Sequence, residues 1–528
     1  MAPGNADAGD PVARQLTEAV TAHDGCYLAD PDEAEIAVLV APPLMAPDAV
    51  SAAQQFGSAT RQLDYQRAVG QRCRRVWLVT TSGERVGSDT PAALPGQAAL
   101  GAMHRSVGFE FPDHTFAHLD LPSRNIDANT AHACVGVLLG EQTEVAWRDG
   151  CLVRTLQECS EPPAERVLDT PAPDDVVITG GSGTIGLRYA RHCVEAGARR
   201  VILLSRNGVG QDDLNRLTHG YPAQVHAPAC DITDADALSM VAEQFGGAGA
   251  ALLIHTAGAA RFAPHDQLGE QALAEVFSAK VTGLVRMTEI WPLRPDARIL
   301  LCSSVSGVWG GYGHGAYAAS NRILDVLAAD LRAKGLDAMA VRWGLWQGTT
   351  IAGADEIARI ERSGLIAMEP DAAVSASLRR YGGDPLILAA DFDRLRVFFE
   401  SQGVSVPFIV AADEADDDSP ADSQSAEQRS VSELVRAEIA AAFSLDGPAS
   451  VDLSAALVDL GADSMLALDL RDRLRRWTGQ SVPAARLLGG ITGTELIDLL
   501  QSAAEQPAAS PEHSAKPERL ERAESSRD

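Results

Sequence analysis

The sequence of 528 residues contains only three lysines, Lys280, Lys334 and Lys516, so nearly all of its positive charge is arginine. A lysine inside a domain of such a chain therefore raises the question of amine chemistry. The sequence has no apolar run of the roughly 18 residues that a membrane-spanning helix needs. Its first residues, MAPGNADAGDP, form neither a basic n-region nor an apolar h-region, so we expect no signal peptide and a cytoplasmic protein.

The eight cysteines are scattered, and no C-x-x-C pair occurs among them. We therefore expect reduced, mostly buried thiols and neither a zinc site nor a disulfide framework. The net charge of −28 argues against nonspecific nucleic-acid binding and against docking on an anionic membrane. No metal, nucleic acid or membrane partner is expected.

Changes in composition divide the chain into segments. An acidic, serine-rich stretch with too little apolar surface to fold separates a long α/β region from a short helical one. We expect a disordered N-terminus (1–12), a first α/β half (13–172), a second α/β half (173–411), an acidic flexible linker (412–429), a small helical domain (430–503) and a disordered tail (504–528).

Short apolar runs alternate with helical patterns before the linker. The second half contains VVITG, RVILLSR, ALLIHTAG, RILLCSS and DAMAVRWG, separated by stretches such as TIGLRYARHCVEAG and GAYAASNRILDVLAADLRAKG. Strands and helices in alternation indicate a parallel sheet covered on both faces, the doubly wound α/β class. VSELVRAEIAAAF, after the linker, has the apolar spacing of a helix, and the segment around it predicts a small helical bundle.

The first half shows a weaker version of the same rhythm, in EIAVLVAP, RRVWLVTTSG, FAHLDLP and EVAWRDGCLVRTL. SGERVG, which follows its second run, lacks the closely spaced glycines that a pyrophosphate needs. No tyrosine with an asparagine four residues on follows in that part. We interpret the first half as a Rossmann-like unit that has lost its site; a generic α/β interaction domain is the alternative.

A glycine-rich turn lies between a predicted strand and a predicted helix in DVVITGGSGTIGLRYA. Gly181, Gly183 and Gly186 fit G-x-G-x-x-G, a pattern that lets backbone approach a pyrophosphate at a helix start. We expect dinucleotide contacts from residues of this turn: Gly181, Ser182, Gly183, Thr184, Ile185 and Gly186.

The end of the next strand indicates which dinucleotide binds. An acidic residue there usually holds the ribose hydroxyls of NAD, whereas an arginine suits the 2′-phosphate of NADP. VILLSRNG ends in Ser205 and Arg206 without an acid. We therefore predict NADPH, with a solvated loop arginine as the alternative reading of Arg206.

These motifs resemble the ketoreductase domains of modular polyketide synthases, members of the short-chain dehydrogenase/reductase superfamily. TGGSGTIG, LLSRNG, CDITD, IHTAG, SAKVTG, CSSVSGVWGGYGHGAYAASN and VRWGLW follow in the order of that family. The resemblance covers most of the chain, because the family also places a degenerate, cofactor-free α/β half before the catalytic one.

The resemblance implies roles for individual residues. Tyr317 would be the proton donor, Ser304 would hydrogen-bond the ketone oxygen, and Lys280 and Asn321 would complete a catalytic tetrad. Asp231 would contact the adenine end of the cofactor, with Ile232 and Ala257 as further cofactor contacts.

The chemistry of a phenol beside an amine agrees with these roles. A free phenol has a pKa near 10, too high for efficient acid–base work at neutral pH. A neighbouring ammonium group stabilises the phenolate, so we expect Lys280 to lower the pKa of Tyr317. Taken alone, Ser304 could be a turn serine and Lys280 a surface lysine.

The helical segment after the linker resembles an acyl carrier protein. LVDLGADSMLALDLRDRL places Ser464 between Asp463 and Met465, at the position where the family carries 4′-phosphopantetheine. A serine at a helix start is more often an N-cap, which is the alternative for Ser464. The resemblance implies a four-helix carrier domain modified by a phosphopantetheinyl transferase.

Two residues near Tyr317 match markers of product stereochemistry in the ketoreductase family. Trp309 lies eight residues before the tyrosine and His314 three before it, and HTAGAARFAPHDQ lacks an L-D-D motif. The resemblance implies substrate-orienting roles for both and an L-configured (3S) hydroxyl. A packing tryptophan and a solvated loop histidine are the alternatives.

The sequence lacks the motifs D-T-A-C-S-S, G-H-S-x-G and H-H-x-x-x-D-G of ketosynthases, acyltransferases and condensation domains. We therefore expect a partial module that reduces a β-ketoacyl chain tethered to its own carrier. Ketosynthase and acyltransferase proteins would act in trans, in polyketide or hybrid peptide–polyketide biosynthesis, siderophores included. The alternatives are a carrier and scaffold protein with a silent reductase, and a free-standing reductase of diffusible ketones.

Overall fold

The structure of the protein is a computed structural model in which two compact units, Met1–Asp417 and Asp418–Asp528, are distinguished. It describes residues 2–3, 10–87, 93–111, 113–157, 174–348, 353–401, 409–410, 431–443, 447–457, 466, 470–471, 473–474, 482, 487 and 491–504. The predicted linker and nearly all of the predicted tail lie outside these residues.

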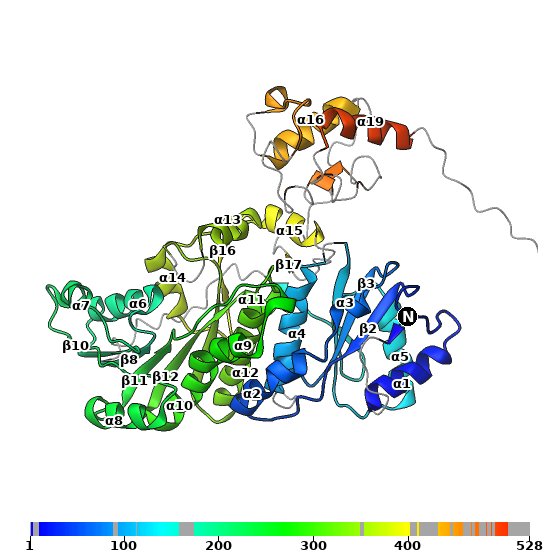
Figure 1. Ribbon diagram of the computed structural model, residues 1–528. Coiled ribbons are helices and arrows are strands. Elements are labelled where there is room, and N and C mark those ends of the chain that lie inside the picture. Colours follow the sequence, from blue (N-terminus) through cyan, green and yellow to red (C-terminus); the bar gives the residue numbers. More distant parts are fainter. Residues whose placement is uncertain are drawn as a thin grey trace, which may run out of the picture. The chain divides into compact units, whose positions relative to one another are not determined.

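The first half of the larger unit contains a six-stranded sheet (Figure 1). Its strands follow chain order: β1 (Ala2–Pro3), β2 (Ile36–Val40), β3 (Arg75–Thr81), β4 (Thr115–Leu121), β5 (Glu144–Trp147) and β6 (Cys151–Val153). All neighbours are parallel except β5 and β6, which form an antiparallel hairpin. The predicted run EVAWRDGCLVRTL is therefore a hairpin, and Asp149 takes a left-handed φ of 58° in its turn.

Helices cover both faces of this sheet, because alternate strand residues point to opposite sides. Ala37 and Leu39 share one core with α2 (Ala49–Thr60) and α4 (Pro95–Gly108). Val38 and Val40 share another with α1 (Pro11–Thr21) and α5 (Ala128–Leu139). The expectation of a doubly wound first half is correct for the two helical layers and wrong for the strand order, which never reverses.

The expectation of a disordered stretch 1–12 is also wrong in part. Ala2–Pro3 pairs with β2, and the carboxylate of Asp10 caps α1 by accepting from the backbone N–H groups of Val12, at 2.9 Å, and Ala13, at 3.2 Å. Asp10 also pairs with Arg124, and Val12 is buried. Capping and burial together hold this helix start in the fold.

The second half contains a seven-stranded parallel sheet in the order β10-β9-β8-β11-β12-β13-β15. The strands are β8 (Asp175–Thr179), β9 (Arg200–Leu204), β10 (Gln224–His226), β11 (Ala250–His255), β12 (Leu293–Ser304), β13 (Asp337–Trp343) and β15 (Leu386–Ile387). The order reverses between β8 and β11, and ligands of such sheets bind at the carboxyl ends of the strands at this point. The predicted doubly wound sheet is present in this half.

The remaining elements of the larger unit are mostly helices. They are α3 (Tyr65–Ala68), α6 (Thr184–Glu195), α7 (Gln211–Thr218), α8 (Ala235–Phe245), a 3₁₀ turn (His265–Gln267), α9 (Glu270–Phe277), a π-helical turn (Ser278–Thr282), α10 (Gly283–Ile290), α11 (Ser306–Trp309), α12 (Gly315–Ala333), α13 (Ala354–Arg362), α14 (Pro370–Ser377) and α15 (Phe392–Ser401). Two small sheets pair β7 (Leu156–Gln157) with β17 (Ile409–Val410) and β14 (Leu365–Ile366) with β16 (Ala389–Ala390).

Helix α12 joins the two halves. It packs against α4 of the first half, and α9 packs against α2 (Figure 1). Nearly every residue of α4 is buried, whereas a helix on the surface of a domain buries only one face, and this burial follows from the position of α4 between the halves.

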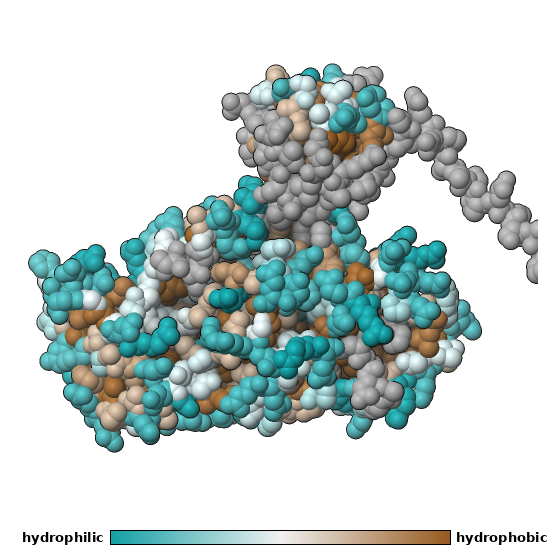
Figure 2. Space-filling model, viewed as in Figure 1, coloured by the Kyte–Doolittle hydropathy of each residue, from teal (hydrophilic) through white to brown (hydrophobic). Residues whose placement is uncertain are grey.

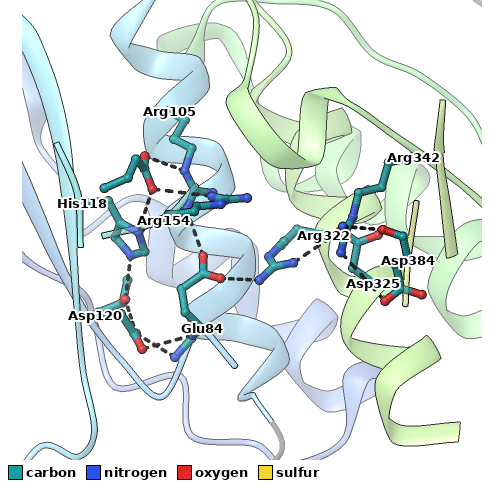
Figure 3. Close-up of polar contacts among 12 residues, drawn as sticks. Glu84, Arg105, His118, Asp120, Arg154, Arg322, Asp325, Arg342 and Asp384 are labelled. Carbon is teal, nitrogen blue, oxygen red and sulfur yellow. Dashed lines mark hydrogen bonds and ion pairs between the residues drawn. The ribbon is translucent and has the colours of Figure 1, made fainter. Parts of the chain in front are cut away.

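A chain of ion pairs crosses the same boundary (Figure 3). Glu84, in the loop after β3, pairs with Arg105 of α4 at 2.9 Å and with Arg322 of α12. On the second half the chain continues through Asp325 to Arg342, at 2.9 Å. A cavity of about 610 Å³, lined by both charged and apolar residues, adjoins these groups, and Tyr317 does not line it.

The smaller unit has one hydrophobic core among its described residues. Helices α16 (Val431–Ala442) and α19 (Gly493–Ala504) pack together, with a 3₁₀ turn at Pro448–Ser450 beside α16. Leu470 and Leu474, between these helices in the chain, are buried in the same core. The predicted four-helix fold of this unit involves residues that lie partly outside those that the structure describes.

The visible surface of residues 1–417 is mainly hydrophilic, with apolar residues showing between the polar ones (Figure 2). Among the described residues, none of the helices is both long enough and apolar enough to span a bilayer.

We predict that Glu84→Gln destabilises the larger unit by about 1–3 kcal/mol, because it leaves two buried arginines with one carboxylate fewer. Chemical denaturation followed by tryptophan fluorescence would measure this. Asp213→Asn, which removes the exposed pair with Arg216, is the control and should change stability by less than about 0.5 kcal/mol. Equal effects of the two substitutions would show that the ion-pair chain does not hold the halves together.

Candidate functional site

The turn between β8 and α6 is shaped by close backbone approach. A Cβ atom at Gly181 would lie 2.6 Å from Cβ of Leu203, and one at Gly186 would lie 2.4 Å from the carbonyl oxygen of Gly180. Only glycine fits at either position. Gly183 is the N-cap of α6 and offers no side-chain cap, and Ser182 and Gly183 are exposed. The turn thus presents exposed backbone at the positive end of a helix, which fits a pyrophosphate.

Gly180 is the residue of this turn that the sequence analysis missed. It takes a positive φ of 70°, and a Cβ there would lie 2.8 Å from the backbone nitrogen of Ala257. The motif G-x-G-x-x-G, as assigned from the sequence, begins one residue later, at Gly181, and therefore omits Gly180. The run of two glycines directly after a strand was the available signal.

The ends of β9 and β10 carry the other predicted cofactor residues. Arg206 is exposed, and its charge contributes to lowering the pKa of Asp231, for which the hydrogen bond from Thr233 is the main cause. The Ser205 hydroxyl donates to the carbonyl oxygen of Gly208 at 2.7 Å, so it holds the turn. Ile232 is buried in the core, which leaves only its backbone to face a ligand.

Ala257 follows β11 and adjoins the glycine turn. Its backbone N–H donates to the Thr179 hydroxyl at 3.4 Å. That hydroxyl lies 2.8 Å from Nδ1 of His255, whose Nε2 lies 3.0 Å from the carbonyl oxygen of Lys280. Burial lowers the pKa of His255 to about 3. A neutral His255 therefore ties the strand ends to the turn that carries Lys280, a role that no sequence pattern indicated.

The four residues of the predicted tetrad converge from three elements. Tyr317 and Asn321 lie one turn apart on α12, Ser304 ends β12, and Lys280 lies in the π-helical turn after α9. π-Helical turns are frequent at functional sites.

Direct contacts connect the members of this group. Nζ of Lys280 donates to Oδ1 of Asn321 at 2.7 Å, and Nδ2 of Asn321 donates to the carbonyl oxygen of Tyr317 at 2.8 Å. Nζ of Lys280 also lies 5.1 Å from the centroid of the Tyr317 ring. Asn321 thus aims the amine at the phenol from one turn along the helix.

Burial dominates the electrostatics of the pair. It lowers the pKa of Lys280 to about 8, and it raises the pKa of Tyr317 in spite of hydrogen bonding with Ser304 and Asn321. The pKa of Tyr317 is therefore raised overall, and the expected lowering beside Lys280 does not decide the direction of the shift. The amine faces the ring and bonds Asn321, and the burial of the phenol outweighs the stabilisation of its charged form.

The two predicted stereochemical markers have different surroundings. Trp309 is buried and packs edge-on against Phe399, with ring centroids 5.5 Å apart, in the apolar cluster formed with α15. His314 is also buried, 6.2 Å from the Tyr317 ring and 4.6 Å from the Phe262 ring between centroids. A solvated loop histidine is therefore excluded for His314, whereas Trp309 has the contacts of a packing residue.

The predicted attachment site, Ser464, lies outside the described residues, as do Asp463 and Met465. Among the residues that the structure describes, no group of three or more histidine, cysteine, aspartate or glutamate side chains could hold a metal ion.

Two family descriptions match the chain. Residues 175–348 match the KR domain, and residues 433–500 match the phosphopantetheine attachment site. Among curated proteins, polyketide synthase GfsA of Streptomyces halstedii is 31% identical over 484 residues, which are 84% of this chain and 6% of GfsA. Erythronolide synthase EryA3 of Saccharopolyspora erythraea is 32% identical over 448 residues, 80% of this chain and 14% of EryA3. The chain thus spans only a small part of these relatives.

Two of the solved structures that are similar to the chain are ketoreductases. The first ketoreductase of the tylosin synthase has a TM-score of 0.64 and 27% identity, over 77% of this chain and 92% of its own. An A1-type ketoreductase has a TM-score of 0.62 and 28% identity, over 75% of this chain and 89% of its own. These comparisons agree with the Rossmann-like fold described above.

We predict that Lys280 titrates near pH 8, since burial disfavours its charged form. The amine is then protonated below that pH and neutral above it. With only three lysines in the chain, NMR of a sample labelled at lysine carbons resolves this directly. The exposed Lys334 is the internal reference, and a Lys280→Met sample assigns the signal. A Lys280 signal that titrates at the ordinary value of 10.5 would contradict the buried, Asn321-bound amine.

Proposed function

We propose that this protein reduces a carrier-tethered β-ketoacyl thioester to the β-hydroxyacyl thioester. Its chain joins a ketoreductase domain to a phosphopantetheine attachment site, and its homologues are modular polyketide synthases. The observation that carries the proposal is the convergence of Tyr317, Ser304, Lys280 and Asn321 beside the glycine turn. The fold class is that of a short-chain dehydrogenase/reductase, and a nicotinamide cofactor is implied.

The side chains of the tetrad divide the work of the reduction. When bound, the nicotinamide supplies hydride to the carbonyl carbon. Tyr317 transfers its phenolic proton to the carbonyl oxygen, and its raised pKa keeps it protonated until that oxygen becomes basic. The Ser304 hydroxyl, which donates to Ser306 at 3.3 Å in the structure, would turn to donate a hydrogen bond to the same oxygen. The ammonium group of Lys280, held by Asn321, stabilises the phenolate that remains.

NADPH is the cofactor that we propose. The glycine turn supports a dinucleotide, because its tight conformation exposes backbone at the start of α6, and side chains at Gly181 or Gly186 would clash with Leu203 or with the Gly180 backbone and disrupt that turn. Arg206 is exposed at the end of β9 and supports recognition of a 2′-phosphate. Ser182 and Thr184 to Ile185 would contact the pyrophosphate, and Asp231 the adenine end.

The first half is proposed to be a degenerate relative of the second. The two halves share a series of parallel strands. Strands β2, β3, β4 and β5 of the first half correspond in order to β11, β12, β13 and β15 of the second, and helices α2 and α4 correspond to α9 with α10 and to α12. Strand β1 takes the place of β8, because it lies parallel beside β2 as β8 lies beside β11, but no strand among the described residues of the first half corresponds to β9 or β10, and no glycine turn there corresponds to the one after β8. Loss of that part removes the strand-order reversal at which a dinucleotide binds.

The carrier role is proposed for the smaller unit, with 4′-phosphopantetheine on Ser464 and a four-helix fold. The match of residues 433–500 supports it. Ketosynthase and acyltransferase activities would be supplied by other polypeptides or domains.

Mass spectrometry after coexpression with a phosphopantetheinyl transferase would show the added arm, and its absence from Ser464→Ala would locate it. A free-standing reductase of diffusible ketones predicts no such addition.

We further propose an L-configured (3S) product. The support is the lack of an L-D-D motif and the place of His314 beside the Tyr317 ring. Chiral chromatography of the released acid identifies the face, and a D-configured product would overturn this part of the proposal.

We predict that Tyr317→Phe abolishes reduction of a β-ketoacyl thioester surrogate while NADPH still binds, because only the acid is lost. Consumption of NADPH by absorbance and cofactor binding by fluorescence would measure the two properties. An unimpaired rate would remove Tyr317 from the mechanism. A wild-type chain that binds NADPH but reduces nothing would favour the scaffold alternative.

We predict that Arg206→Ala raises KM for NADPH by about 10- to 100-fold and leaves KM for NADH nearly unchanged, since only the former loses a charge-assisted contact. Initial rates with each cofactor test this. Arg216→Ala, another exposed arginine of the same half, serves as the control. Equal changes for both cofactors would show that Arg206 does not contact the 2′-phosphate.

A further inference from the structure

A continuous row of polar side chains leads from Ser304 to helix α13. The Ser304 and Ser306 hydroxyl oxygens lie 3.3 Å apart, and the backbone N–H of Ser306 donates to the Ser304 oxygen at 3.2 Å. The Ser306 hydroxyl lies 3.0 Å from Nδ1 of His314, and Nε2 of His314 lies 2.9 Å from Oε1 of Glu356. His314 and Glu356, which lie 42 positions apart in the chain, are thus in contact, and the row connects both to Ser304 of the candidate site.

This row is shielded from solvent. Ser304, Ser306 and His314 are exposed by 5–7%, and the side chain of Glu356 by 13%. Buried polar groups of this kind are costly unless each has a partner. Here each group is the partner of the next, so the loss of one leaves its neighbour unsatisfied.

Glu356 determines the orientation of the His314 ring and the proton on its Nε2. Burial acts to raise the pKa of Glu356, but the hydrogen bond and charge of His314, with Arg359 and Arg362, lower it overall. A carboxylate only accepts hydrogen bonds, so Nε2 of His314 must carry a proton toward it. The ring is then held in one orientation, with Nδ1 facing Ser306.

Polar contacts also attach α13 to the segment before α12. None of the residues of α13 is fully buried, although Ile360 is packed beside the apolar cluster of Trp309. Arg359 donates to Glu356 at 2.8 Å and lies 4.8 Å from the centroid of the Tyr312 ring. Glu356 is therefore the group through which α13 reaches the site.

We propose that Glu356 is a positioning residue for the ketone reduction: it orients His314, which holds Ser306, which in turn holds the Ser304 hydroxyl where the ketone oxygen must bind. The proposal rests on the proposed function, because Ser304 matters only if the site reduces a carbonyl. It gives α13 a part in catalysis although none of its described side chains contacts Tyr317.

The first test compares three variants of α13 in the full chain with a β-ketoacyl thioester surrogate. Glu356→Ala should lower kcat by about 5- to 30-fold, the effect of removing one buried hydrogen-bond partner, and leave KM for NADPH unchanged. Glu356→Gln should keep most of the rate, because its amide oxygen still accepts from Nε2. Glu361→Gln, an exposed change of the same charge on the same helix, is the control and should behave as wild type.

A double-mutant cycle separates positioning from general loosening of α13. Ser306→Ala breaks the row far from α13, so Glu356→Ala should lower kcat little further in the Ser306→Ala background. Additive effects, or equal losses in Glu356→Gln and Glu356→Ala, would overturn the proposal.

Hydrogen exchange provides a measurement that does not depend on turnover. Glu356→Ala should speed exchange in residues 304–309 as well as in α13, and Glu361→Gln should do neither. If the wild-type chain proves inactive, the proposed function fails while this measurement still decides whether Glu356 supports Ser304. Unchanged exchange in residues 304–309 would overturn the positioning role.

Discussion

The candidate site depends on the close packing of α12 between the second sheet and α4 of the first half. Small residues make that packing possible: Ala316, Ala318 and Ala319 are fully buried, and a Cβ atom on Gly310 would lie 2.7 Å from the backbone nitrogen of Ser106. The helix that carries Tyr317 and Asn321 is therefore held on one side by the first half of the chain. The first half thus supports the geometry of the candidate site.

Burial of α12 has a chemical consequence. Lys280 reaches Asn321 from the π-helical turn through the buried interior, where its charge is disfavoured. The phenol of Tyr317 is likewise kept neutral. The site at rest thus holds an acid that retains its proton and an amine that releases its proton easily. Both properties suit a reaction in which negative charge appears at one oxygen and is removed at once.

Much of this could be predicted from the sequence, for identifiable reasons. Strands β8, β9, β11, β12 and β13 follow from apolar runs between glycine-rich turns, and the tetrad follows from the order of its motifs. The structure places Lys280 in contact with Asn321, and the catalytic roles of the four residues stay a prediction. These features depend on local pattern and on a resemblance whose quoted motifs lie in the second half.

Other features depend on which distant segments meet, and sequence patterns do not contain that information. Glu356 and Ser306 are connected only because the fold places His314 between them. The pKa of Tyr317 is raised because tertiary packing buries its phenol. The strand order of the first half is likewise a property of pairing, since the alternation of strands and helices is the same for both orders.

The most direct test of the central claim follows a label onto the tethered chain. The protein would carry a β-ketoacyl group on its phosphopantetheine arm and receive NADPH deuterated on the transferred face of the nicotinamide. Mass spectrometry of the acyl-arm peptide should show one deuterium bound to the β-carbon and one exchangeable hydrogen on the new hydroxyl. An acyl group that keeps its original mass, on a chain that binds the labelled cofactor, would contradict the assignment of this site as a ketoreductase.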